Sequence, residues 1–190
     1  MKKDRALQVA YMAGLFDGEG CIICLRRTDK KTNHYRIALQ VWMCSYQWVD
    51  HFIGQFGGKV RMAYGGTKKP GWIWDLQGLP NVKTALKTML PFLKVKKTEA
   101  EFALRLIDRV IVGNRDRLKQ GVKGIHGGTT KYSDHEIQQR QLLIDAIKDC
   151  KNVKFGYPKC ISEEERIRIR AAVETKYNDK QRISSKFRYR

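Results

Sequence analysis

One run near the N-terminus constrains the fold most, because it joins a helix with small residues, a carboxylate flanked by glycines and a strand. The segment 7–16 is apolar, and small residues leave one of its faces with little side-chain volume: Ala10, Ala13 and Gly14. The sequence Asp-Gly-Glu-Gly at 17–20 ends the helix, because glycine is unfavourable inside helices and adopts backbone angles closed to other residues. We therefore predict that Glu19 lies at the end of a helix.

A carboxylate at this position has an unusual electrostatic setting. Helical carbonyl groups point toward the C-terminal end of a helix, so a negative charge there gains nothing from the helix dipole. A bound cation would remove that disadvantage, which makes Glu19 a candidate metal ligand. The alternative is an ordinary turn from helix to strand that carries an exposed acid.

The composition favours a polyanionic partner. The 190 residues include 38 Lys and Arg against 19 Asp and Glu, a formal net charge of +19. Phosphates neutralised by such side chains release counterions, so we expect salt-dependent binding to nucleic acid. The alternatives are a basic surface that keeps the protein soluble and an anionic-membrane binder. No apolar run approaches the ~20 residues of a membrane span and no signal peptide is recognised. We expect a soluble intracellular protein of the cytoplasm, nucleoid or an organelle matrix that is not secreted and binds no membrane.

The cysteines and histidines do not indicate a disulfide framework or a zinc site. Five cysteines at irregular spacing favour reduced thiols. Cys21 and Cys24 have the CxxC spacing, but residues three apart on a strand point to opposite faces, and no second pair follows. Nothing resembles a Ser-His-Asp or Cys-His nucleophile arrangement.

The periodicity of the remaining chain predicts an α+β fold. Strands are expected at 21–27, 35–41, 59–63 and 72–77, because apolar and polar residues alternate there. Helices are expected at 47–56, 81–90 and 98–113, and Gly57 ends the first of them. In that first helix Trp48, Phe52 and Phe56 are expected to pack on the sheet. The segment 64–71 is expected to be a long loop.

One face of this sheet is predicted to be open and basic, which favours a nucleic-acid groove. The alternative is a simple solvated face. Arginine, lysine and glutamine are side chains that make bidentate hydrogen bonds to base edges in the major groove. The candidate DNA-binding residues on this face and in the neighbouring loop are Arg27, Arg36, Gln40, Lys59, Arg61, Lys68, Lys69, Asp75 and Gln77.

The chain is expected to divide into a core at 1–113, a flexible linker at 114–132 and a basic helical extension at 133–190. The linker segment is rich in glycine and lysine and poor in apolar residues. A capping box at 133–136 opens a predicted helix to about residue 150, and Ser162 opens another to about Tyr177. Basic residues crowd the last stretch, which is typical of a non-specific phosphate contact or of a disordered tail.

Two segments resemble one known family. Met12 to Gly20 resembles the nonapeptide that names the LAGLIDADG homing endonucleases, with Glu19 at the acidic metal-binding position. The segment 91–96, Pro-Phe-Leu-Lys-Val-Lys, resembles the one that supplies the active-site lysine of that family. The resemblance covers residues 7–112 and implies an α-β-β-α-β-β-α-α core, whose four-stranded antiparallel sheet is a saddle in the DNA major groove.

The resemblance also implies how the site is assembled. A single carboxylate is too few for metal-assisted phosphodiester hydrolysis, and the motif occurs once, so we expect a second subunit to complete the site. The homodimer interface is expected along the small-residue face and the helix end, at Ala10, Ala13, Gly14 and Asp17. Carried over from the family are Mg²⁺ binding by Glu19 and the Gly18 carbonyl, where Mn²⁺ or Ca²⁺ can substitute, and a catalytic function for Lys96.

The expected function is a site-specific double-strand DNA endonuclease that cuts a long near-palindromic target as a homodimer. The chain departs from the family at Met43, where a glutamine that orders water is usual, and Gln40 and Gln47 are the candidates to replace it. The alternative is a catalytically weak or inactive binding protein on the same fold, either a maturase that binds intron RNA or a transcription regulator. The basic C-terminal region keeps the RNA partner open.

Overall fold

The protein is described from a computed structural model, which covers residues 2–28, 33–64, 70–119 and 132–154, together with Ala171, Thr175 and Asn178. The chain forms two compact units. The first contains residues 1–24 and 36–107, and the second contains residues 25–35 and 108–190. Each unit is described by itself. The domain boundaries expected from the sequence, at 113 and 132, stay a prediction.

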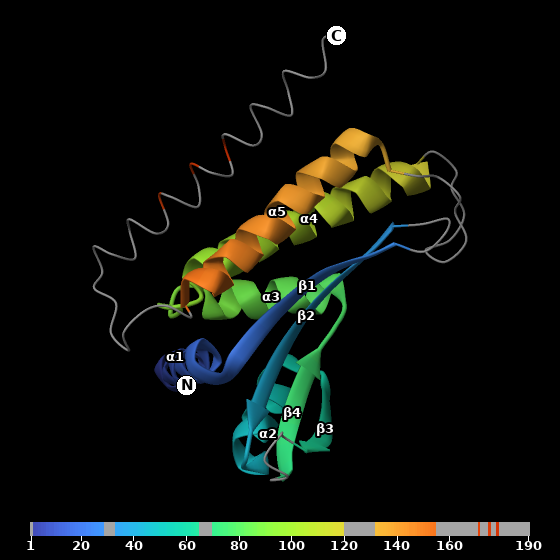
Figure 1. Ribbon diagram of the computed structural model, residues 1–190. Coiled ribbons are helices and arrows are strands. Elements are labelled where there is room, and N and C mark those ends of the chain that lie inside the picture. The colour runs from blue at the N-terminus through green and yellow to red at the C-terminus, as the bar shows by residue number, and fades with distance from the viewer. Residues whose placement is uncertain are drawn as a thin grey trace. The chain divides into compact units, whose positions relative to one another are not determined.

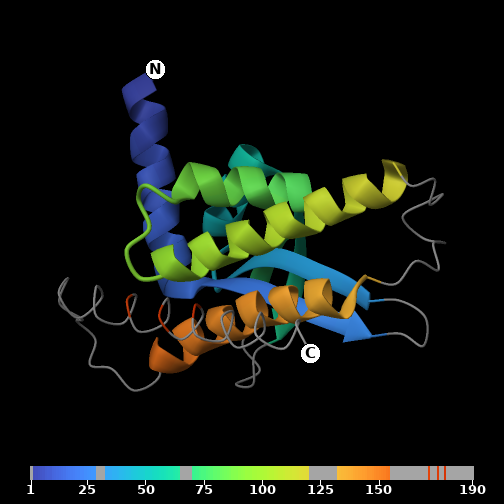
Figure 2. The ribbon, with the colours of Figure 1, turned by 90° about the horizontal axis from the view of Figure 1, so that it is seen from above.

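The elements follow the predicted order (Figure 1), which confirms the α+β class. They are α1 Lys2–Glu19, β1 Gly20–Thr28, β2 Asn33–Met43, α2 Tyr46–Phe56, β3 Lys59–Tyr64, β4 Pro70–Leu76, α3 Leu79–Met89, α4 Lys97–Lys119 and α5 Asp134–Lys154. The four strands form one antiparallel sheet in the order β1-β2-β4-β3. Figure 2 shows α1 leading directly into β1, as the sequence predicts for a helix that ends at Glu19.

The strand register confirms the predicted alternation. Asp75 of β4 lies opposite Gln40 of β2 on one side and opposite Lys59 of β3 on the other. Ile73 likewise lies between Trp42 and Arg61. Because directly opposed residues point to the same face, these two rows share one face of the sheet.

The core of the first unit lies against the other face. Ile37, Leu39, Val41, Trp74 and Leu76 are buried there. Helix α2 packs on β4 and β3, and its Phe52 ring lies 4.8 Å from the Trp74 ring, centroid to centroid. Helix α1 packs on α3, whose buried residues are Val82, Ala85, Leu86 and Met89.

The packing face of α2 differs from the prediction. Phe52 and Phe56 contact Trp74 as expected, but Trp48 is exposed and its ring lies 5.6 Å from that of Tyr11 in α1. Val49 is buried in its place. Residues four apart lie on one side of a helix, but the buried surface of a helix is wider than a single line of such residues. Trp48 lies at the edge of that buried surface. Gly57 ends the helix with φ of 69°, as predicted.

Helix α4 is longer than predicted, because it continues through Gly113 to Lys119. The expected linker therefore begins within this helix, and its residues 120–131 lie outside the described part of the chain. A side chain at Gly113 would collide with the Arg140 guanidinium. This glycine permits close packing between α4 and α5 and does not end the helix. The strand β4 also begins earlier than predicted, at Pro70.

In the second unit, α5 begins at a cap that the sequence predicts. The backbone N–H of Glu136 donates to the Ser133 hydroxyl at 3.2 Å. The Glu136 carboxylate accepts from Arg109 at 2.9 Å and from Arg140 at 2.8 Å. It thus links α4 to α5. The predicted helix from Ser162 to Tyr177 and the basic tail fall almost wholly outside the described residues.

Two further observations concern the described residues only. Cys21 is exposed and Cys24 is buried, as expected for residues that point to opposite strand faces. A search of the described helices finds none with the length and apolar character needed to cross a membrane.

Candidate active site and nucleic-acid face

The end of α1 carries the carboxylate that the sequence singles out. Glu19 is the last residue of the helix and is exposed. Gly20 lies against the side chain and carbonyl of Phe16, where a Cβ atom would overlap both. The absence of a side chain at Gly20 therefore lets the chain turn sharply from helix to strand. This turn is what leaves Glu19 at the helix end.

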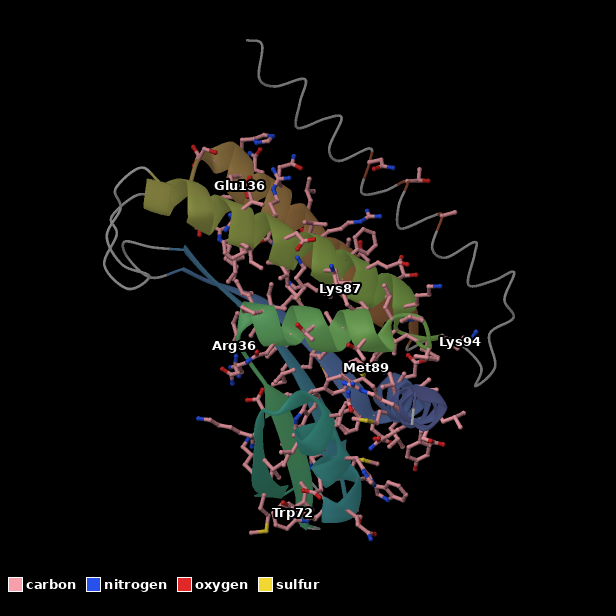
Figure 3. All side chains as sticks on the ribbon, turned by 180° about the vertical axis from the view of Figure 1, so that it is seen from behind. Arg36, Trp72, Lys87, Met89, Lys94 and Glu136 are labelled. Atoms are coloured by element: carbon pink, nitrogen blue, oxygen red, sulfur yellow. The ribbon has the colours of Figure 1, made fainter. Side chains whose placement is uncertain are left out.

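Asp17 fixes a distant segment against this helix end. Its Oδ2 accepts from the backbone N–H groups of Lys94 at 2.6 Å and Val95 at 3.0 Å, and its Oδ1 accepts from that of Lys96 at 2.8 Å. Three consecutive N–H groups thus converge on one carboxylate, an arrangement suited to a negative charge. Lys94, in the loop that follows α3, is labelled in Figure 3. Asp17 thereby joins the two sequence motifs, which lie far apart in the chain.

The same loop places Lys96 at the helix end. The Lys96 ammonium donates to the backbone carbonyl of Asp17, and the residue is only 7% exposed. A cation at a helix C-terminus is electrostatically favourable, because the terminal carbonyls lack partners within the helix. Lys96 therefore has a structural interaction in the monomer, and it lies beside the segment that carries Glu19.

The expected dimer face is partly free in the single chain. Gly14 is exposed, and a Cβ atom at Gly14 or Gly18 would meet nothing within 4 Å. Ala13, in contrast, is fully buried within the unit, and its place in the dimer interface stays a prediction. Ala10 is half-buried, and Asp17 holds the loop 94–96. Two exposed apolar residues that the prediction omitted, Leu7 and Tyr11, extend this helix surface.

The basic face of the sheet contains a polar cluster centred on Asp75. Its Oδ2 accepts from Gln77 Nε2 at 2.6 Å and lies 3.8 Å from Arg36 Nη2. Within the described residues, Asp75 Oδ1 and Arg36 Nε are buried polar atoms without a hydrogen-bond partner. One acceptor and one donor thus remain unsatisfied on this face, although buried polar groups are normally paired. Figure 3 labels Arg36 on β2.

The other candidates on this face are distributed as follows. Lys59 and Arg61 are exposed on β3, and Gln40 is half-buried on β2. Arg27 lies in β1, but its side chain is outside the described part of the structure, as are Lys68 and Lys69 altogether. Met43 lies opposite Trp72 in the register, on the row of covered-face residues, and Gln47 is exposed in the first turn of α2.

Sequence reasoning missed one aromatic residue of this face. Trp42 shares the row of Ile73 and Arg61 and is half-buried, and its indole fills the space that a side chain at Gly71 would need. The signal was present, since Trp42 alternates with Val41 and continues the row of Gln40. The predicted strand ends at residue 41, whereas β2 continues to Met43 and therefore includes Trp42.

The single chain does not form a complete metal site among its described residues, since no group of three or more His, Cys, Asp or Glu side chains converges there. The donor set at the end of α1 still suits a hard divalent cation. Glu19 offers an exposed carboxylate, and the last turn offers carbonyl oxygens without helical partners. The missing ligands would have to come from outside the chain.

Comparison with known proteins places this geometry in context. No protein-family model matches the chain, and no curated protein matches it in sequence. Solved structures do match. The homing endonuclease I-CvuI, in complex with its target in the presence of Ca, aligns over 90% of this chain and 97% of its own, with a TM-score of 0.59 and 19% identity.

Two further structures agree. The archaeal intron-encoded homing endonuclease I-Vdi141I, complexed with DNA, covers 92% of this chain and 98% of its own, with a TM-score of 0.59 and 9% identity. The LAGLIDADG homing endonuclease I-GzeII, in complex with a DNA target, gives a TM-score of 0.54 and 13% identity over 82% of this chain, which spans 50% of its length. The chain therefore has the fold of the LAGLIDADG homing endonucleases.

Proposed function

We propose that the protein is a site-specific DNA endonuclease that acts as a homodimer with a divalent metal ion. One observation carries this proposal: the Asp17 carboxylate binds three consecutive N–H groups of the loop 94–96 and so brings Lys96 to the helix end that carries Glu19. A fold alone does not imply a function, but here the two motifs that the family resemblance singled out meet in space.

The dimer follows from the number of ligands. One chain supplies a single exposed carboxylate, whereas a metal ion that bridges a phosphodiester needs more oxygen ligands. A second copy packed along the open surface at Gly14 and Gly18 would bring a second Glu19 to the same place. The comparisons support this stoichiometry, because the chain spans nearly all of I-CvuI and half of I-GzeII.

Each residue then has a defined task. The Glu19 carboxylates and Gly18 carbonyls would hold Mg²⁺, or Mn²⁺ or Ca²⁺ in its place. When bound, such an ion polarises the phosphate and activates water. Lys96 would stabilise negative charge that develops on the phosphate, and its interaction with the Asp17 carbonyl orients it for that task. Asp17 is a positioning residue.

The substrate is recognised by the basic sheet face. Lys59 and Arg61 are exposed there, and such side chains can contact phosphates and base edges. One I-CvuI structure contains uncleaved DNA and the I-Vdi141I structure is a complex with DNA, which supports duplex DNA as the ligand. Intron RNA remains the alternative ligand, which competition between duplex DNA and structured RNA for binding would distinguish.

The proposal is tested by cleavage of a randomised plasmid library with Mg²⁺. Wild-type protein should cut one near-palindromic sequence, and Glu19→Gln should bind that sequence without cutting it. Asp50→Asn, at an exposed acid of α2 away from the motif, is the matched control and should cut normally. Binding without cleavage by all three proteins would contradict the enzyme and leave a maturase or a regulator.

A further inference from the structure

The basic face of the sheet also carries apolar side chains, which the proposed mechanism does not use. The strand register pairs Trp42 with Ile73 and Ile73 with Arg61, so these three residues form one row of this face. The next row toward the start of β4 contains Gly71 opposite Ala63. Trp42 and Ile73 are half-buried, so part of each side chain is accessible to solvent. We call Trp42, Ile73, Gly71 and Ala63 the apolar patch.

The Trp42 indole extends from β2 over β4. Its Nε1, Cε2 and Cζ2 atoms lie 2.6–2.7 Å from the position that a Cβ atom at Gly71 would occupy. Trp42 and Gly71 are diagonal neighbours in the register, within reach of an aromatic side chain. The contact with Gly71 accounts for the position of the indole. It does not account for Ile73, because a sheet face in water usually carries polar residues.

The opposite face of these strands is covered. Val41 and Trp74 point to that face and are fully buried, and the Trp74 ring packs on Phe52 of α2. The face with the apolar patch also carries the exposed side chains of Lys59 and Arg61. Of the two sheet faces, as far as the structure describes them, this one is open and basic. A DNA duplex bound to the sheet would therefore meet the apolar patch.

The topology places the apolar patch at the Glu19 end of the sheet. Strand β1 begins at Gly20, directly after Glu19 (Figure 2), and β2 is its antiparallel neighbour. The last residues of β2 therefore lie at the same end of the sheet as the first residues of β1. Trp42 is the next-to-last residue of β2, about 7 Å closer to that end than Gln40. All these residues belong to the first unit.

The chemistry of the major groove limits what an apolar patch can bind. Base pairs present hydrogen-bond donors and acceptors there, and the 5-methyl group of thymine is the apolar group among them. A polar base edge against the patch would lose water without gaining a hydrogen bond. We propose that Trp42 and Ile73 are specificity-determining residues that bind the 5-methyl group of a thymine near the cleavage position, one in each half of the target. The inference rests on the proposed function.

The test removes the methyl group and leaves the hydrogen-bonding edge of the base intact. Full-length wild-type protein first selects its target from a randomised duplex pool. Each thymine near the cleavage position is then replaced by uracil in both half-sites. An equal mixture of thymine and uracil duplexes is cut with Mg²⁺ in one reaction, and the ratio of the two products gives the ratio of their kcat/KM values.

For wild type we expect the thymine duplex to be preferred about fifteenfold at one symmetric pair of positions, about fourfold for each buried methyl group. Ile73→Thr keeps a β-branched side chain but adds a hydroxyl, and Trp42→Gln removes the indole. Each variant should bring the preference close to about 1, because the methyl group then loses its apolar partner.

Two features of the design separate base recognition from stability. Both duplexes compete for the same active molecules, so a variant that is only less stable would cut less of both and keep the ratio. Met62→Ala is the matched control, because Met62 is an exposed apolar residue of β3 that lies opposite Trp72 in the row of the covered face. This variant should keep the wild-type ratio.

The outcomes separate the two proposals. If wild type cuts a selected site in which no thymine near the cleavage position responds to uracil, the assignment of Trp42 and Ile73 is wrong and the proposed function stands. The same conclusion follows if the ratio stays at its wild-type value in both variants. If wild type cuts no duplex, the proposed function itself fails, and the inference fails with it.

Discussion

At the scale of single residues, the Asp17 carboxylate joins the two sequence motifs of the candidate active site. The resemblance places Asp17 at the expected dimer interface, and the structure shows its bonds within one chain: three backbone N–H groups on one carboxylate. Sequence analysis identified both motifs but not this connection, because nothing in the spacing of Asp17 and Lys96 reveals that their segments meet.

Replacing Asp17 with alanine is expected to destabilise the first unit by about 2 kcal/mol, because hydrogen bonds to a charged acceptor are among the stronger ones. Asp17→Asn, which retains one acceptor oxygen, should cost less. Urea unfolding measures both, with Asp50→Asn as the control. An Asp17→Ala protein as stable as wild type would show that the loop 94–96 is held by other contacts.

Tyr35 provides a prediction about pH. Burial raises the pKa of the Tyr35 phenol above its ordinary value of 10.0, although the nearby charges of Arg140 and Arg26 oppose this shift. A raised pKa in the folded state means that stability is fully present below pH 10 and is lost as the pH rises through the folded pKa, because the unfolded chain releases its proton first.

Tyr35→Phe should therefore lose less stability than wild type between pH 9 and pH 11 in urea titrations, with tyrosine ionisation followed by ultraviolet absorbance. At pH 7 the variant should be as stable as wild type or slightly more stable, because the Tyr35 hydroxyl is buried without a hydrogen-bond partner among the described residues. Equal pH dependence of the two proteins would contradict the burial of this phenol.

At the scale of elements, the sequence predicted order and type well and boundaries less well. Alternation along β2, β3 and β4 was read correctly, because each strand buries one face and exposes the other. The sequence predicts helix ends at both Gly57 and Gly113, yet of these two only Gly57 has positive φ. Gly113 serves tertiary packing instead of ending a helix, because its missing side chain makes room for Arg140 of α5.

The two serine caps give a matched pair for testing element stability. Ser133 accepts from the N–H of Glu136, whereas Ser45 at the start of α2 makes no side-chain cap hydrogen bond. Ser133→Ala should lower the free energy of unfolding by about 1 kcal/mol, a typical loss for an N-cap. Ser45→Ala should change it much less, and equal losses in thermal or urea unfolding would contradict the assigned cap.

At the scale of the whole molecule, the charge of +19 is the property that the sequence states most directly. The placement of that charge had to come from the strand register, which sets Lys59 and Arg61 on one face with Asp75 between Lys59 and Gln40. The contribution of Arg27, Lys68 and Lys69 stays a prediction, because these side chains lie outside the described residues.

Binding to duplex DNA should weaken linearly with salt on a double-logarithmic plot. Lys59→Ala should reduce the slope by about 2 for a dimer, one phosphate contact for each protomer. Lys87→Ala, at an exposed lysine of α3 labelled in Figure 3, is the control and should leave the slope unchanged. A slope that responds equally to both substitutions would place the DNA elsewhere.

The central claim is that two chains share one cleavage site through their Glu19 carboxylates. The most direct measurement mixes wild-type and Glu19→Gln chains in equal amounts, allows the subunits to exchange, and counts the breaks in each strand of the selected target with Mg²⁺, so that nicked and fully cut products are distinguished. If every cut requires both carboxylates, total strand breaks should fall to about one quarter of the wild-type level, the fraction of dimers with two wild-type chains, and no nicked product should accumulate. A fall to about one half, with nicked product from the mixed dimers, would mean that each chain cuts one strand independently, and would contradict the shared site.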